Sequence, residues 1–135
     1  MFNNPDAGLF LVRLGIGLNV LVLSGWAKVT GGEALLHQVG SAMPSFGIPW
    51  MPLVWGALAA FAEAGGSILL ILGVSFRFAA FLLAFTMAVA VTAHVGMPPG
   101  PYAGWQGASH ALTNLSIYLA LLLFGPGKYV LKLKK

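Results

Sequence analysis

The chain has 135 residues, of which 59% are hydrophobic and only 7% are charged, and its formal net charge at pH 7 is +4. Because soluble domains are about a quarter charged, this chain cannot cover itself with polar surface, and its exterior is expected to face lipid. The cations lie at segment ends, which is not a nucleic-acid-binding pattern, and the lack of cysteine excludes disulfides, thiol redox chemistry, iron–sulfur ligation and covalent c-type haem within the chain.

Four apolar stretches have the length of a membrane-spanning helix, which needs about 20 apolar residues. They lie at about 7–26, 52–73, 76–95 and 105–124. No positively charged region precedes the first stretch, so no cleavable signal peptide is expected. The sequence therefore predicts one all-α membrane domain over residues 1–135, an antiparallel four-helix bundle in which the second and third spans form a tight hairpin around Ser75.

The two longer links between spans differ in kind. Residues 31–50 contain "EALLHQV", which predicts a short interfacial helix at about 32–42 because Leu35, Leu36 and Val39 fall within about one turn. The link at 96–104, "GMPPGPYAG", is too rich in proline and glycine for regular structure.

An even number of spans puts both termini on one side of the membrane. That side carries most of the cations: Arg77 and the tail lysines Lys128, Lys132, Lys134 and Lys135. On the opposite side, the one lysine or arginine near the links is Lys28, at the edge of the first span. The positive-inside rule then predicts that both termini, including the basic tail 128–135, are cytoplasmic.

Polar residues of three spans fall at similar depths. Glu63 lies near the midplane, Asn114 lies at nearly the same height, His110 lies one turn above it, and His94 lies level with His110. An ionisable group at this depth is a functional hypothesis by default. We expect Glu63 to be protonated and bonded to Asn114, or through water to His110, as a proton-transfer candidate or as a purely structural acid.

Two cations of the first span need separate explanations. Arg13 is a weaker partner for Glu63, because the two side chains lean in opposite directions along their helices. We expect Arg13 to be an interfacial anchor that reaches the headgroups. Lys28 is either a similar anchor or a member of the histidine layer, toward which it leans. His37 is expected in a wet loop.

Three segments together resemble the DoxX family of small four-helix membrane proteins. They are "SGWAKVTGG", "EAGGSILLILGVSFRFAAFLLAFTMAVAVTAH" and "LALLLFGPGKYVLKLKK", and the resemblance covers roughly Leu9 to Lys132. The positions that match the family pattern are Lys28, Glu63, Gly65, Gly66, Arg77, His94, Gly125, Pro126 and Gly127.

The resemblance implies a bacterial or archaeal plasma-membrane protein. Some relatives are small subunits of thiosulfate:quinone oxidoreductases, and others are associated with redox or oxidative-stress systems. The chain departs from the family in two places. His110 stands where many relatives have an acidic residue, and Val130-Leu131-Lys132 replaces a Ser-Leu-Asp. A quinone reductase role therefore does not transfer intact.

The favoured function is a quinone-interacting or membrane-anchoring component of an oxidoreductase system. Lys28, Glu63, His94, His110 and Asn114 supply the donors and the proton route that a quinone needs. No flavin, iron–sulfur or nucleotide motif is evident, so electrons are expected from a soluble or membrane partner, and a homo-oligomer is compatible with the sequence. One alternative is a non-enzymatic accessory protein or a small-molecule or proton carrier. Another is a haem or metal site at His94 and His110.

Overall fold

The structure is a computed structural model that describes residues 3–132. Its elements, in chain order, are α1 (Pro5–Val20), the π-helical turn η1 (Leu21–Gly25), α2 (Trp26–Thr30), α3 (Gly32–Gly40), the 3₁₀ turn η2 (Met43–Phe46), α4 (Pro52–Leu72), α5 (Phe76–Gly96) and α6 (Gly104–Phe124). No strand occurs within this described range.

Four helical stretches are long and apolar enough to cross a membrane. They are the continuous α1–η1–α2 rod (Pro5–Thr30), α4, α5 and α6. The all-helical fold with four candidate spans and one extra short helix is therefore confirmed. The first span begins two residues earlier than predicted and continues to Thr30, because η1 carries the helix on instead of ending it.

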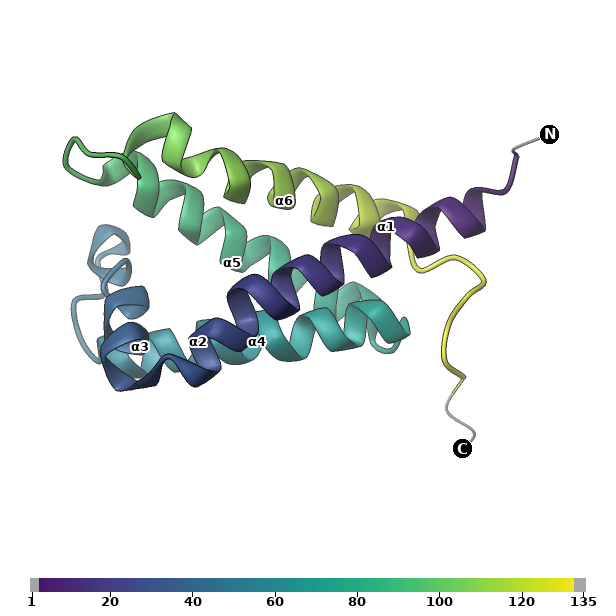
Figure 1. The fold of residues 1–135 in the computed structure, drawn as a ribbon, viewed down its shortest axis with the longest axis horizontal. Coiled ribbons are helices and arrows are strands. Elements are labelled where there is room, and N and C mark those ends of the chain that lie inside the picture. Colours follow the sequence, from purple (N-terminus) through teal and green to yellow (C-terminus); the bar gives the residue numbers. More distant parts are fainter. Residues whose placement is uncertain (1–2, 133–135) are drawn as a thin grey trace.

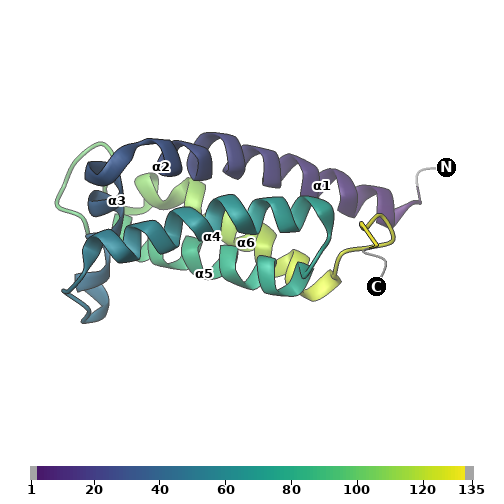
Figure 2. The ribbon, with the colours of Figure 1, turned by 90° about the horizontal axis from the view of Figure 1, so that it is seen from below.

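The described ends of the chain lie at one end of the bundle, which we call the terminal end (Figures 1 and 2). The hairpin between α4 and α5 turns at this end, and α3 and η2 lie at the opposite end, the α3 end. In Figure 1, α1 crosses α6 near the terminal end and separates from it toward the α3 end. This separation leaves room between helices in one half of the molecule.

Local sequence explains where the helices begin and turn. Asn4 caps α1, its side-chain oxygen accepting from the Ala7 amide at 3.1 Å, and Pro5 follows at the first helical position. Pro52 starts α4 in the same way. Gly73 ends α4 with φ 72°, the left-handed conformation that glycine adopts without steric penalty.

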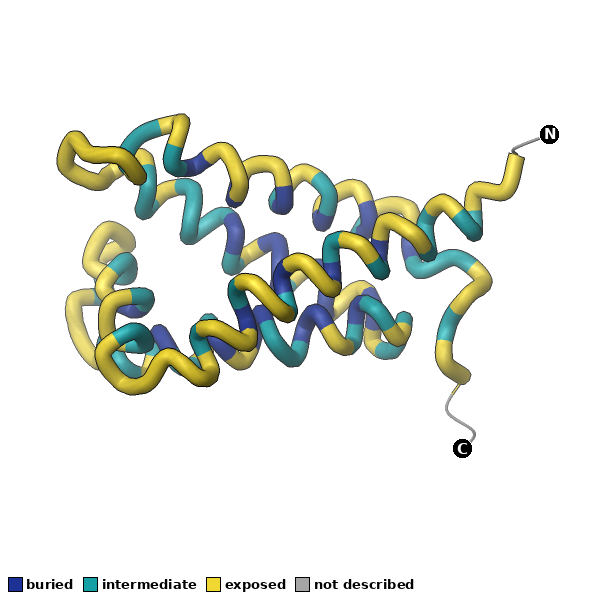
Figure 3. The backbone as a smooth tube through the Cα atoms, in the orientation of Figure 1, coloured by how far each residue is buried: buried dark blue, intermediate teal, exposed yellow. Residues whose placement is uncertain are grey.

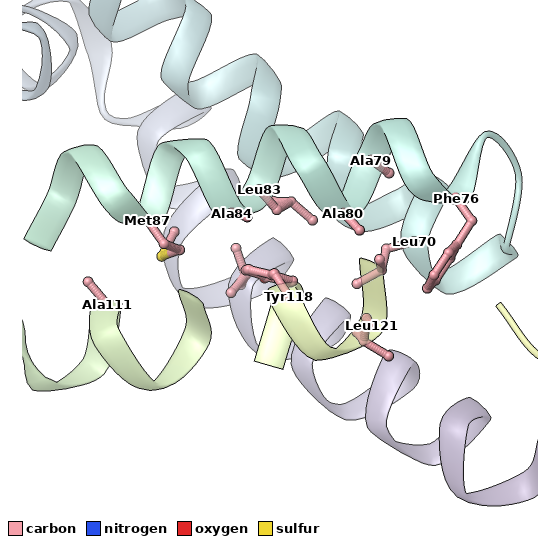
Figure 4. Packing of buried hydrophobic residues seen from close by; sticks show 11 residues of the cluster. Leu70, Phe76, Ala79, Ala80, Leu83, Ala84, Met87, Ala111, Tyr118 and Leu121 are labelled. Atoms are coloured by element: carbon pink, nitrogen blue, oxygen red, sulfur yellow. The ribbon is translucent and has the colours of Figure 1, made fainter. Parts of the chain in front are cut away.

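The apolar core fills the terminal half of the bundle. Leu70 and Leu83 are fully buried between α4 and α5, and Tyr118 and Leu121 of α6 close the cluster (Figure 4). Ala79 and Ala80 are also fully buried, and side chains this small let helix backbones approach closely in lipid.

The outward faces of the helices are apolar. Buried positions form inward stripes along each helix, and the rest of each span is exposed (Figure 3). Large apolar side chains such as Phe61, Phe78, Phe85 and Leu123 are among the exposed ones. Such a surface is suited to a lipid bilayer, as the composition predicted.

The extra helix α3 lies directly on the backbone of α4. A Cβ added to Gly40 would overlap the Pro52 carbonyl, and one added to Gly56 would overlap the Leu36 carbonyl. Glycine at both positions therefore permits the crossing. The predicted short helix is confirmed and ends at Gly40, two residues before the expected boundary.

Candidate functional site

Glu63 is held by two side chains of the first span. The Lys28 ammonium donates to Oε1 at 2.5 Å, and the Ser24 hydroxyl donates to Oε2 at 2.5 Å. The Glu63 side chain is 1% exposed and that of Lys28 is 20% exposed. The expected bond between Glu63 and Asn114 is wrong, because both carboxyl oxygens accept from the first span instead. The opposite charge of Lys28 offsets the desolvation of the carboxylate.

The π-helical turn and one glycine bring these groups together. Ser24 lies in η1 and Lys28 follows four residues later, so both fall on one helix face. A Cβ on Gly25 would lie 2.8 Å from the Ala64 nitrogen, so only glycine lets the rod touch α4 beside Glu63. Single π-helical turns inside α-helices are frequent at functional sites. Sequence reasoning missed Ser24 as a partner, although its spacing from Lys28 was a signal.

All five predicted ligand-binding residues line one chamber of about 150 Å³. Lys28 and Glu63 come from α2 and α4, His94 comes from α5, and His110 and Asn114 come from α6. The chamber lies where α6 and the first span separate, and the exposed His110 forms part of its rim. At about 30 Å³ per molecule, the volume corresponds to about five waters.

A second and larger space adjoins the chamber. This cleft, of about 480 Å³, is enclosed by α3, the residues around η2, α4 and α5. It shares Lys28, Glu63, Ala90 and His94 with the chamber. We call these four residues the partition, because each contributes to the walls of both spaces.

Hydrogen bonds assign different roles to the two histidines. Nδ1 of His94 lies 2.8 Å from the Tyr102 carbonyl oxygen. A carbonyl only accepts, so Nδ1 carries the proton and Nε2 of the neutral ring is an acceptor. At His110, Nδ1 lies 3.4 Å from the amide nitrogen of Asn114, which donates, so Nε2 carries the proton. These tautomers, assigned from hydrogen-bond partners, give the chamber one basic and one donating imidazole nitrogen.

The polar faces of α4 and α6 continue from the chamber toward the terminal end. Ser67 lies one turn from Glu63, and Tyr118 lies one turn from Asn114. Both hydroxyls are buried and have no hydrogen-bond partner among the described residues. Sequence reasoning did not single out either residue, since an isolated Ser or Tyr carries no distinct pattern.

Arg13 lies at the terminal end, away from the chamber, and is 0% exposed. Its guanidinium donates to four carbonyl oxygens: Leu70 at 3.0 Å, Ile71 at 2.7 Å, Pro126 at 2.6 Å and Tyr129 at 2.8 Å. The expectation of a snorkelling interfacial anchor is therefore wrong. The guanidinium thus supplies donors to the last turn of α4, where the Leu70 carbonyl also accepts from the Gly73 amide at 3.2 Å.

The Gly-Pro-Gly segment and the start of the tail provide the other two carbonyl acceptors of Arg13. Gly125 and Gly127 have φ values of 83° and 72°, and the turn between them presents the Pro126 carbonyl to Arg13. Lys128 then binds Asp6, with its backbone amide 3.1 Å from Oδ1 and its ammonium 3.2 Å from Oδ2. The start of the tail is thus fastened to α1 and α4.

The remaining predicted residues lie outside the chamber. Arg77 is exposed at the start of α5, and His37 is exposed on α3, in a helix and not the expected loop. Gly65 has open space where a Cβ would be, whereas a Cβ on Gly66 would lie 3.0 Å from the Leu83 side chain. The predictions for Lys134 and Lys135 concern positions outside the described residues.

Comparison with known proteins identifies the family. A sequence model of the DoxX family matches residues 8–96, which include Lys28, Glu63 and His94 of the partition but not α6. Neither the curated proteins nor the solved structures include a significant match. The matched stretch covers more than half of the chain and includes three of its four candidate spans. This four-span membrane protein therefore belongs to the DoxX family.

Proposed function

We propose that the chamber binds the headgroup of a lipid-soluble quinone, and that the protein acts as the quinone-binding membrane component of an oxidoreductase system. The observation that carries this proposal is the convergence of Lys28, Glu63, His94, His110 and Asn114 on one small cavity in a membrane-spanning bundle. A volume of about 150 Å³ is comparable to one substituted six-membered ring.

The donors and acceptors of the chamber match the two oxygens of a quinone or quinol. Nε2–H of His110 and the Lys28 ammonium donate to a carbonyl oxygen, and Nε2 of His94 accepts from a hydroxyl. Apolar side chains of Val20 and Met87 complete the lining. A few placed polar groups in an otherwise apolar pocket are typical of small-molecule sites.

The position of the chamber supports entry from the bilayer. α1 and α6 separate toward the α3 end, and His110 at the rim is exposed (Figure 1). A quinone headgroup enters between these helices while its apolar tail stays in lipid. This route requires no opening of the packed core around Leu83 and Tyr118.

Electrons reach the quinone from a soluble or membrane oxidoreductase partner. We place the protein in a prokaryotic plasma membrane with both ends cytoplasmic, because Arg77 and Lys128 lie at the terminal end. Toward the other end, Lys28 is the single lysine or arginine among the described residues. A haem between His94 and His110 is less favoured, since the chamber has room for about five waters.

Equilibrium binding of decylubiquinone to the purified protein tests the proposal. Binding is followed by quenching of tryptophan fluorescence, and we expect a saturable curve. Asn114→Leu and His110→Leu should weaken binding about tenfold, because each removes a polar contact and leaves a buried group unpaired. Thr113→Val, on the exposed face of the same helix, is the matched control. Absence of saturable binding to the folded protein overturns the proposal.

A further inference from the structure

The cleft beside the chamber has no role in headgroup binding, yet it leads from the end of the bundle to the same residues. Its lining includes Gly96, Met97 and Pro98, where α5 ends at the boundary of the span. It reaches inward to Thr86 and Glu63. With about 1.5 Å of rise per residue, the path along α5 is about 15 to 18 Å long.

Polar side chains line the cleft at several levels, among mostly apolar neighbours. Gln38, Ser41 and Ser45 line it near the α3 end, and Thr86 lines its inner part. A space of about 480 Å³ with several polar partners is large enough for a chain of water molecules. Besides α4 and α5, the chamber is lined by the first span and α6, and the cleft by α3 and the residues around η2, so the two spaces meet at the partition.

We propose that the cleft is the proton entrance of the site and that His94 passes protons between cleft water and the ligand in the chamber. This inference rests on the proposed quinone function. His94 lines both spaces, and its bond to the Tyr102 carbonyl fixes the ring so that Nε2 is the exchanging atom. Among the described residues, the other titratable groups around these spaces are Lys28 on α2, Glu63 on α4 and His110 on α6.

The ion pair at the partition allows His94 to become charged. The Glu63 carboxylate compensates the Lys28 ammonium at 2.5 Å, so the partition has no net charge while His94 is neutral. A lone ammonium beside His94 would oppose protonation of the ring, and the paired carboxylate removes most of that opposition. Lys28 and Glu63 therefore act as positioning residues for the proton step.

The chemistry balances as follows. A redox cofactor of the partner protein supplies two electrons to the quinone, and two protons must follow to give the quinol. One proton leaves Nε2 of the His94 imidazolium and forms the O–H bond on the quinone oxygen that His94 faces, and the other reaches the second oxygen from water at the His110 rim. Cleft water then returns a proton to Nε2. The Nδ1–H bond to Tyr102 persists throughout.

The test measures reduction of bound decylubiquinone by dithionite, with the protein in excess and in nanodiscs. At saturating protein, where a weaker Kd does not affect the rate, His94→Ala should reduce the bound quinone about 100-fold more slowly, because a general acid is lost. Added imidazole should restore the rate through the cleft. A rescued rate also shows that the variant is folded, and a purely structural role of His94 would give no rescue.

A variant that narrows the cleft separates this inference from the binding proposal. Ala93 lines the cleft but not the chamber, so Ala93→Phe should slow reduction and prevent imidazole rescue in the His94→Ala background. Ala120→Phe, on the exposed face of α6, should change neither. Normal binding with unchanged rates in His94→Ala, or slow reduction without rescue, overturns the proton entrance alone. Absence of binding in the wild type overturns both proposals.

Discussion

The ammonium of Lys28 lies 2.5 Å from the Glu63 carboxylate and connects the first span to α4 at the centre of the candidate site. Only Lys28 has partial access to solvent, since its side chain is 20% exposed and that of Glu63 is 1% exposed. The two charges compensate each other inside the bundle. Loss of either one leaves the other uncompensated.

We predict that Glu63→Gln destabilises the folded protein by about 3 kcal/mol, because it leaves the Lys28 ammonium without its counter-charge. Lys28→Met should cost a similar amount by leaving the carboxylate unpaired. The double variant, Glu63→Gln with Lys28→Met, should recover most of the loss. Reversible unfolding of the four proteins in mixed detergent micelles gives the coupling energy. Additive losses in the double variant would contradict the ion pair.

Arg13 should be the most sensitive cation for stability. Arg13→Met keeps much of the side-chain length but removes the donor to the carbonyls of Ile71, Pro126 and Tyr129, whereas the Leu70 carbonyl keeps the Gly73 amide. We expect a loss of about 3 to 5 kcal/mol and faster amide hydrogen exchange at Leu131, whose amide binds the Leu72 carbonyl at 2.9 Å.

Arg77→Met is the matched control for this prediction, because Arg77 is exposed at the same end of the bundle. Its stability should change by less than about 0.5 kcal/mol. Equal losses in the two variants would show that general charge loss, and not the carbonyl bonds, explains the effect.

Substitution of glycine by alanine should have opposite effects at two positions of α4. Gly56→Ala should disrupt the contact with α3, because the new Cβ would overlap the Leu36 carbonyl. Gly65→Ala meets open space and should be neutral or stabilising by up to about 1 kcal/mol. Thermal unfolding of both variants checks this contrast, and a stable Gly56→Ala protein would refute the described packing of α3.

The topology makes a separate prediction. A cytoplasm-dependent reporter fused after Lys135 should be active, because Arg77 and Lys128 lie at the terminal end. A reporter that requires the periplasm should be inactive at the same position. The reverse result would place the cleft and α3 on the cytoplasmic side and exclude the proposed orientation.

Much of the fold could be predicted from the sequence because span length and hydropathy are local properties. The bounds of α4, α5 and α6 differ from the predicted spans by at most one residue. Depth was estimated by counting residues along each helix. This estimate placed His94, His110 and Asn114 near Glu63 because the rise per residue of a helix is constant. The extended first span was missed because a π-helical turn has no simple sequence pattern.

The hydrogen-bond partners were harder to predict than the positions. The lean of side chains toward the N-terminus correctly separated Arg13 from Glu63, but it could not show that the terminal carbonyls of α4 were available to Arg13. Likewise, height along the bundle could not show that Gly25 brings Ser24 within bonding distance of Glu63 while Asn114 stays with His110. Both outcomes depend on lateral contacts between helices.

The attachment of Arg13 to the tail also orders events during synthesis. The first span leaves the ribosome long before Pro126 and Tyr129, which follow Arg13 by 113 and 116 residues. Until those residues arrive, a guanidinium inside the bilayer lacks half of its acceptors. The first span, α4 and the start of the tail therefore reach their final packing together, because the guanidinium has all four acceptors only when the three segments are present.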